Sequence, residues 1–393
     1  MKKKVFISIF CLKDIGGIST SAYNLLCSIH DMYEVTLCVV SGFISDRYEL
    51  PKDIKIINGS SALGDVTIDR KFLSKQSFLR KILRSLRRIQ KHFGSHCYYR
   101  YLDSIKIHEE YDAALAFTDF FFTDGDNRIR YDYYNITKNV KARVKLAWVH
   151  NDPIKLGITK DTSNLIFEGI SGIINVSEDG KRIFDTVSPQ LSNISYVVYN
   201  TYNIDQIKSK AICKENLYEN NSNVHFVTVG RVNSKQKRMD RIIEVCRRLK
   251  AEGIVNFDWT IVGDGEDKQK MISDVKKSKL ETIVQFVGLK SNPYPYISQA
   301  DAFVLTSAYE GLPMTVKEAQ ILGIPTLVTR FGSAKEAVIE GKQGVICDNS
   351  TDGVYNMIKE ILLEPQQLQV YKDYLNEFPV SNNVAIRQIN ELI

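Results

Sequence analysis

Short apolar runs recur along the whole chain, and polar or amphipathic stretches long enough for helices separate them. In the first half these runs are residues 5–12, 34–40, 53–57, 113–117, 144–150, 173–177 and 196–200. In the second half they are residues 225–230, 259–263, 284–288, 302–307, 326–329 and 345–347. Several consist almost entirely of valine, isoleucine, leucine and phenylalanine, which is typical of parallel strands covered on both faces. Their alternation with helices predicts βαβ units and doubly wound α/β sheets.

The series of runs starts again at Val224, after a polar stretch over residues 200–223. At roughly 150 residues per domain, a chain of 393 residues suits two or three domains. We therefore expect two Rossmann-like domains of similar size that face each other across a cleft, over residues 1–205 and 206–380. Residues 381–393 are expected to form a helix that packs back toward the first domain.

The composition is that of a globular protein, with 44% hydrophobic and 25% charged residues. No run of 18 apolar residues is present, so a membrane-spanning helix is not expected. The first twelve residues resemble a signal peptide only superficially, because Lys13 and Asp14 follow at once without a small-residue cleavage site. The seven cysteines contain no C-x-x-C pair, which argues against a zinc site or a disulfide framework and favours a reducing cytosol.

The net charge of +6 comes from the first half of the chain, where residues 70–91 contain nine basic residues and no acidic one. Apolar residues recur there at spacings of three and four, at Leu79, Ile82, Leu83, Leu86, Ile89 and Phe93. This pattern predicts an amphipathic helix with a cationic face over residues 78–93. Two interpretations stay open: a helix docked on the domain core, or one that binds an anionic membrane surface. Binding to nucleic acid is not expected, because no stacking or base-reading motif accompanies the charge.

Two cations follow the strand predicted over residues 225–230. Arg231 comes directly after Gly230, and Lys237 lies six residues further on, just before a helix predicted to begin near residue 238 or 239. Ligands of open α/β sheets bind outside the carboxyl ends of the strands, and an arginine with a lysine there suits a diphosphate. Surface arginines and lysines are common, so this pair alone carries little weight.

The most specific motif is Ser-Ala-Tyr-Glu-Gly-Leu-Pro over residues 307–313, followed by a second glutamate at 318. We expect Glu310 in a loop after a strand and Glu318 one or two turns into the next helix. A carboxylate accepts hydrogen bonds from paired hydroxyls, which suits a sugar or a ribose. Gly311 lets the backbone approach a ligand closely.

Three weaker signals accompany these motifs. A Gly-Gly turn at Gly16 and Gly17 follows the first strand, and His150 closes the strand over residues 144–150. Either feature is also compatible with a purely structural role. The sequence Gly-Asp-Gly at residues 263–265 has lysine at position 268, so the dinucleotide fingerprint is incomplete. We interpret it as a tight strand-to-helix turn, and no nicotinamide cofactor is expected.

Taken together, the motifs resemble those of the retaining glycosyltransferases of family 4. The resemblance is carried, in order, by the Gly-Gly loop, W-V-H, V-V-Y-N, G-R…K-R-M-D-R-I-I, I-V-G-D-G, F-V-G, S-A-Y-E-G-L-P…E-A, G-I-P and G-V-I. These are two-domain GT-B enzymes, often found in bacterial capsule, O-antigen and exopolysaccharide assembly. The resemblance covers nearly the full chain and is strongest over residues 224–347.

By this resemblance the second domain would hold the donor. Arg231 and Lys237 would bind its diphosphate, Glu310 would face the sugar hydroxyls, and Glu318 would accept hydrogen bonds from the ribose hydroxyls. The chain departs from the family at Arg238, where a glycine commonly follows the lysine.

The remaining implied roles concern backbone and first-domain positions. The amides of Gly311 and Leu312 would help to bind the phosphates, and the turn ending at Gly288 would border the base. Gly16 and Gly17 would line the phosphate and acceptor side, and the side chain of His150 would reach the donor sugar.

The resemblance implies a cytoplasmic glycosyltransferase at the inner face of the cell membrane. It would move a sugar from a nucleotide-sugar, with UDP as the expected nucleotide, to a glycan acceptor that is expected to be lipid-linked. No cofactor and no metal are expected, because two cations already face the diphosphate. A GT-B sugar-nucleotide epimerase, a two-lobed sugar-binding protein without activity and a degenerate transferase that supports a partner enzyme remain alternatives.

Overall fold

The computed structural model describes residues 1–12, 16–58, 107–118, 131–218 and 223–393. The chain divides into two compact units, and each is described by itself. The first unit comprises residues 1–202 together with 382–393, and the second unit comprises residues 203–381. The amphipathic segment predicted over residues 78–93 lies outside the described residues. Among the described residues, no helix combines the length and the apolar character needed to cross a membrane.

The first unit is built on a parallel sheet of seven described strands in the order β3-β2-β1-β4-β5-β6-β7. The strands are β1 (Lys4–Ile9), β2 (Glu34–Val39), β3 (Lys55–Asn58), β4 (Glu110–Ala116), β5 (Lys141–Val149), β6 (Gly172–Asn175) and β7 (Ser195–Val197). β1 and β4 are buried almost throughout, as apolar strands at the centre of a doubly wound sheet must be.

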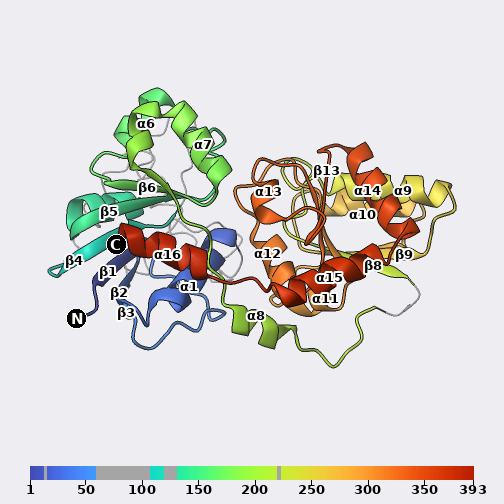
Figure 1. Ribbon diagram of the computed structural model, residues 1–393, viewed down its shortest axis with the longest axis horizontal. Helices are drawn as coiled ribbons and strands as arrows, with labels where there is room; N and C mark the ends of the chain where they lie inside the picture. The colour runs from blue at the N-terminus through green and yellow to red at the C-terminus, as the bar shows by residue number, and fades with distance from the viewer. Residues whose placement is uncertain (13–15, 59–106, 119–130, 219–222) are drawn as a thin grey trace, which may run out of the picture. The chain divides into compact units, whose positions relative to one another are not determined.

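Helices of the first unit complete its core. They are α1 (Gly17–Ile29), α5 (Tyr131–Tyr134), α6 (Lys160–Ile166), α7 (Glu178–Val187) and, from the end of the chain, α16 (Asn383–Leu392). α16 is tied to this unit by side-chain hydrogen bonds (Figure 1). The Tyr33 hydroxyl donates to Asn390 Oδ1 at 2.5 Å, and Gln388 Oε1 accepts from the Tyr199 amide at 3.0 Å.

The second unit has a parallel sheet of six described strands in the order β10-β9-β8-β11-β12-β13. The strands are β8 (Val224–Val229), β9 (Phe257–Val262), β10 (Val284–Gly288), β11 (Ala302–Leu305), β12 (Thr326–Thr329) and β13 (Gly344–Cys347). Numbered from β8, this is the Rossmann order 3-2-1-4-5-6, in which the direction of winding reverses between the first and fourth strands.

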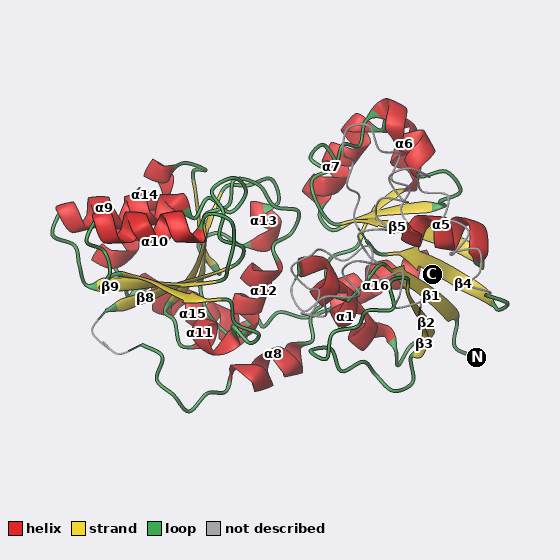
Figure 2. Ribbon diagram, turned by 180° about the vertical axis from the view of Figure 1, so that it is seen from behind, coloured by secondary structure: helices red, strands yellow, loops and turns green. Residues whose placement is uncertain are grey.

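Helices cover both faces of this second sheet. They are α8 (Ile204–Ala211), α9 (Asp240–Ala251), α10 (Lys268–Lys277), α11 (Tyr294–Ser298), α12 (Met314–Ile321), α13 (Ala334–Ala337), α14 (Thr351–Leu363) and α15 (Gln367–Glu377). α9, α10 and α14 lie on one face and α11 on the other (Figures 1 and 2). The core includes Trp259, which is fully buried and donates from Nε1 to Thr228 Oγ1 at 3.0 Å.

The predicted strands are all present in the described part of the chain, with ends that differ by up to three residues. The α/β class and the two doubly wound sheets are therefore confirmed.

Candidate functional site

Two loops meet where the strand order of the second unit reverses. One follows β8 and runs from Gly230 to Met239, and the other follows β11 and contains residues 306–313. The Ala308 amide donates to the Gln236 carbonyl at 2.7 Å, so the loops are joined directly. The crevice at such a reversal is where open α/β sheets bind ligands.

The centre of this site is an ion pair between the loops. Lys237 Nζ lies 2.7 Å from Glu310 Oε1, and the two side chains are only 17% and 8% exposed. Ser307, which is fully buried, donates from Oγ to the same Oε1 at 2.6 Å. The sequence places Lys237 and Glu310 73 residues apart, and the topology brings them into contact.

The backbone that carries Lys237 is fixed on both sides. Asn233, which is buried, accepts from the amides of Gln236 at 3.1 Å and Lys237 at 2.9 Å through its side-chain oxygen. The Thr306 hydroxyl donates to the Lys237 carbonyl at 2.8 Å. The position of the lysine is therefore determined by the fold rather than by its own flexible chain.

A buried guanidinium ties the same loops to the segment that follows β13. Arg241 NH1 donates to the Thr306 carbonyl at 3.0 Å and to Asn349 Oδ1 at 2.7 Å. Asn349 in turn donates to the Ala308 carbonyl at 2.9 Å. Burial is the largest cause that lowers the pKa of Arg241, which nevertheless stays charged near neutral pH. This network stabilises the loop that carries Glu310.

Arg231 differs from Lys237 in its surroundings. It is exposed and makes no hydrogen bond or ion pair with the residues that the structure describes. It follows Gly230 at the carboxyl end of β8, which leaves its charge available to an anion at this edge of the sheet.

The Gly-Asp-Gly sequence packs against the loop that carries both cations. A Cβ at Gly263 would lie 1.9 Å from the Gly230 carbonyl oxygen, and one at Gly265 would lie 2.2 Å from that of Val232. Both positions therefore require glycine. The sequence interpretation as a tight turn is incomplete, because the glycines allow two loops to touch.

Arg238 has a left-handed backbone conformation, with φ of 48°. Such a residue cannot continue a right-handed helix, which explains why α9 begins at Asp240 rather than at 238 or 239. The same conformation gives a physical reason why glycine would suit this position. The guanidinium is held by Asp240, whose carboxylate raises the pKa of Arg238 through a hydrogen bond.

Glu318 lies in α12 and is buried, with 5% exposure. The Tyr294 hydroxyl lies 3.4 Å from its Oε1. The neighbouring Lys317 donates from Nζ to Gln320 Oε1 at 2.9 Å, and burial lowers the pKa of Lys317 to about 8.

The backbone positions named by the resemblance are found in two places. Leu312 is buried in the loop after β11, beside Gly311. Gly288 ends β10 with φ of 77°, and Lys268 Nζ lies 3.6 Å from the place that a Cβ on Gly288 would occupy.

Three predicted residues belong to the first unit. Gly17 begins α1, and Gly16 directly before it has φ of 152°. His150 follows β5 and is 9% exposed; its Nε2 donates to the Phe117 carbonyl at 2.9 Å, and its ring packs on those of Phe117 and Trp148. These contacts fix the ring of His150 at the carboxyl end of the first sheet.

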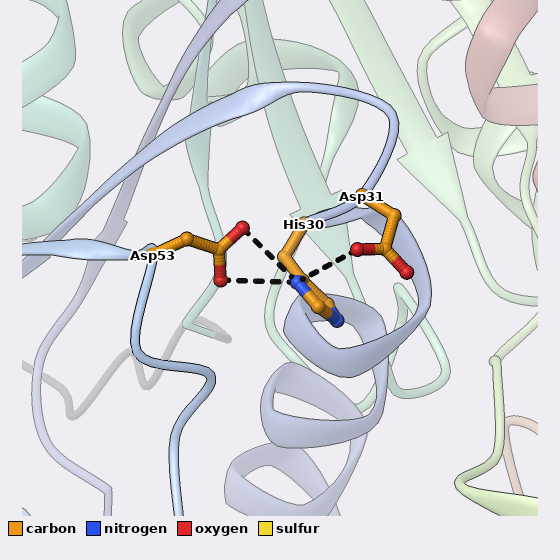
Figure 3. A group of neighbouring side chains, drawn as sticks. All are labelled: His30, Asp31 and Asp53. Atoms are coloured by element: carbon orange, nitrogen blue, oxygen red, sulfur yellow. Dashed lines mark hydrogen bonds and ion pairs between the residues drawn. The ribbon is translucent and has the colours of Figure 1, made fainter.

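One group of described side chains could hold a metal ion: His30, Asp31 and Asp53, at the end of α1 and before β3. Figure 3 shows both carboxylates directed at Nδ1 of His30, at 3.0 Å for Asp53 and 3.4 Å for Asp31. The hydrogen bond from His30 is the largest cause that lowers the pKa of Asp53. The hydrogen bond between His30 and Asp53 accounts for the contact between them, and both carboxylates are exposed.

Sequence reasoning missed several residues that shape the site. Ser307 stands in the quoted motif three residues before Glu310, and that spacing to a hydroxyl was the available signal. Asn233, four residues before Lys237, is a residue type that accepts backbone hydrogen bonds in turns. Arg241 and Asn349 are 108 residues apart and gave no local signal.

Residues 210–377, nearly all of the second unit, match a family model described as glycosyl transferases group 1. An uncharacterized glycosyltransferase of Methanocaldococcus jannaschii is 27% identical over 259 residues, which cover 63% of this chain and 62% of that protein. The amylovoran biosynthesis glycosyltransferase AmsD of Erwinia amylovora is 26% identical over 143 residues, which cover 36% of this chain and 39% of AmsD. The chain thus spans less than two thirds of these relatives.

The fold is shared with solved structures over the whole chain. The crystal structure of Anabaena HepE in complex with UDP and glucose superimposes with a TM-score of 0.70 at 14% identity, covering 99% of this chain and 98% of that one. The fold is GT-B, as the sequence predicts. The match to the glycosyl transferases group 1 model lies within the second unit.

Proposed function

We propose that the chain is a retaining glycosyltransferase of family 4 that uses a nucleotide-sugar, with UDP as the nucleotide. The observation that carries the proposal is the position of Arg231, Lys237 and Glu310. All three lie at the carboxyl ends of β8 and β11, inside the segment that matches the glycosyltransferase model. A lysine in contact with a shielded carboxylate, with a second, exposed cation on the same loop, suits a ligand that joins a diphosphate to a polyol.

In this proposal the two cations act on the leaving group. As the bond between the anomeric carbon and the diphosphate oxygen breaks, negative charge grows on that oxygen. Arg231 and Lys237 stabilise this charge, which lowers the barrier without a metal. The acceptor hydroxyl attacks from the same face and gives its proton to the departing phosphate, so the anomeric configuration is retained.

The other residues bind and orient. Glu310 accepts hydrogen bonds from donor-sugar hydroxyls, and Glu318 accepts them from the ribose. The amides of Gly311 and Leu312 support the phosphates, and Gly288 borders the base. In the first unit, Gly16 and Gly17 line the phosphate and acceptor side, and His150 contacts the donor sugar.

The proposed acceptor is a growing, lipid-linked glycan in cell-surface polysaccharide synthesis. The name of the Erwinia relative places that protein in amylovoran biosynthesis, which supports a polysaccharide role here. The basic segment over residues 78–93 supports a position on the cytoplasmic membrane surface, where a lipid-linked acceptor would be found.

A donor-consumption assay with a panel of UDP-sugars and lipid-linked acceptors tests the proposal. We expect one UDP-sugar to be consumed only with acceptor present, and NMR of the product to show the donor's anomeric configuration. Glu318→Ala should mainly weaken nucleotide binding, and Lys237→Ala should mainly slow transfer. Conversion of the donor without an acceptor would instead indicate an epimerase, and binding without any turnover would indicate a sugar-binding protein.

A further inference from the structure

Lys237 and Glu310 each have a proposed partner in the donor, yet in the structure each is the other's partner. Their 2.7 Å contact is shielded from water, at 17% and 8% exposure. Arg231, in contrast, is exposed. The two cations are therefore not equivalent: the charge of Arg231 is available to an anion, whereas the charge of Lys237 is already balanced by a carboxylate.

We propose that Glu310 competes with the nucleotide diphosphate for Lys237, so that the ion pair opposes the binding of a nucleoside diphosphate and favours its release after transfer. This inference rests on the proposed function, because it assigns a regulatory role to the same donor site.

Charge, rather than geometry, makes the two partners compete. A lysine has three N–H donors and could contact both anions at once. However, a shielded carboxylate 2.7 Å from Nζ cancels much of the field that the lysine offers a phosphate. Lys237 must weaken its bond to Glu310 in order to bind the diphosphate, and a carboxylate that loses its counter-charge under poor solvation is destabilised.

Ser307 explains how Glu310 can tolerate that loss. Its hydroxyl donates to the same carboxylate oxygen at 2.6 Å and comes from the loop after β11, the loop that also carries Glu310, rather than from the lysine loop. Glu310 therefore keeps one hydrogen bond when Lys237 turns to the diphosphate. An intact nucleotide-sugar adds hydroxyl donors to Glu310 and compensates it further, whereas UDP does not. The ion pair thus discriminates against the product and in favour of the donor.

The test is calorimetric titration of UDP into four proteins: wild type, Glu310→Gln, Lys237→Met and the double variant. We expect Glu310→Gln to bind UDP about tenfold more tightly than wild type, which corresponds to about 1.4 kcal/mol. In the Lys237→Met background, Glu310→Gln should change the affinity less than twofold. Glu244→Gln serves as the control for net charge, because Glu244 pairs with Arg247 on α9, and UDP affinity should not change.

Two results would overturn the inference while leaving the proposed function intact. One is a Glu310→Gln variant that binds UDP no more tightly than wild type. The other is an equal gain in the Lys237→Met background, which would show direct repulsion by Glu310 rather than competition for the lysine. If Glu310→Gln does not fold, Ser307→Ala should bind UDP more weakly than wild type, because Glu310 then loses its remaining hydrogen bond when Lys237 turns away. A Ser307→Ala variant that binds UDP as tightly as wild type, or more tightly, would overturn the inference. A wild-type protein that binds no UDP, GDP or ADP would refute the proposed function and the inference together.

Discussion

Replacement of Gly263 by alanine tests whether the Gly-Asp-Gly turn holds the cation loop in place. A Cβ at this position would lie 1.9 Å from the Gly230 carbonyl oxygen. Carbon–oxygen contacts are normally no closer than about 3.3 Å, so the ends of β8 and β9 would have to separate by about 1.4 Å. Such a shift would strain the hydrogen bonds from the Gly230 amide to Val262 and from the Gly263 amide to Gly288.

The expected loss in the free energy of unfolding follows from these contacts. Overpacking costs about 1–3 kcal/mol, and each weakened hydrogen bond costs about 1 kcal/mol. We therefore expect Gly263→Ala to destabilise the second unit by about 3 kcal/mol. The matched control is Gly253→Ala, where φ is 81° and no atom lies within 4 Å of the new Cβ. That change introduces backbone strain alone, of about 1–2 kcal/mol.

The two tryptophans make the assay specific to one unit, since Trp148 lies in the first and Trp259 in the second. In a Trp148→Phe background, urea unfolding followed by fluorescence reports on Trp259 alone. A Gly263→Ala variant no less stable than Gly253→Ala would refute the close-packing argument.

Three further predictions concern charge. Burial lowers the pKa of Lys317 to about 8, so between pH 8 and 10.5 the unfolded chain binds more protons and stability rises with pH. Near pH 7, the free energy of unfolding of Lys317→Met should therefore exceed that of wild type by up to about 3 kcal/mol. Urea unfolding measured at several pH values should show this difference closing by pH 10. A metal chelator should leave the rate of sugar transfer unchanged. A loss of activity that manganese or magnesium restores would contradict this expectation. The next residues to test would then be Asp124 and Asp126, which form an Asp-x-Asp sequence outside the described residues. Charge reversal at Arg80, Arg84, Arg87 and Arg88 should release the protein from anionic vesicles, as should high salt. A wild-type protein that does not bind such vesicles at low salt would exclude the membrane role.

The sequence predicts the strands well because central parallel strands are buried on both faces and consist mostly of apolar residues, as β8 and β11 do. Strand ends are predicted less accurately, because buried apolar residues continue beyond the residues of the named strand. Leu12, for example, is fully buried three residues after β1 has ended. The start of α9 depends on the positive φ of Arg238, which no hydrophobic pattern reveals.

The site was predicted as a set of residues and not as a set of contacts. Glu310 and Lys237 both follow strands in the sequence, but their pairing depends on β8 and β11 being neighbours in the sheet. That adjacency follows from the winding order, which one sequence does not specify. The support from Asn233 and from Arg241 depends on loops that meet only after folding.

A crystal structure of the protein with UDP tests the central claim most directly. We expect the diphosphate to lie between Arg231 and Lys237 at the carboxyl ends of β8 and β11, with the ribose hydroxyls on Glu318. UDP bound away from the loops after β8 and β11, or a diphosphate with neither cation within hydrogen-bond distance, would contradict it.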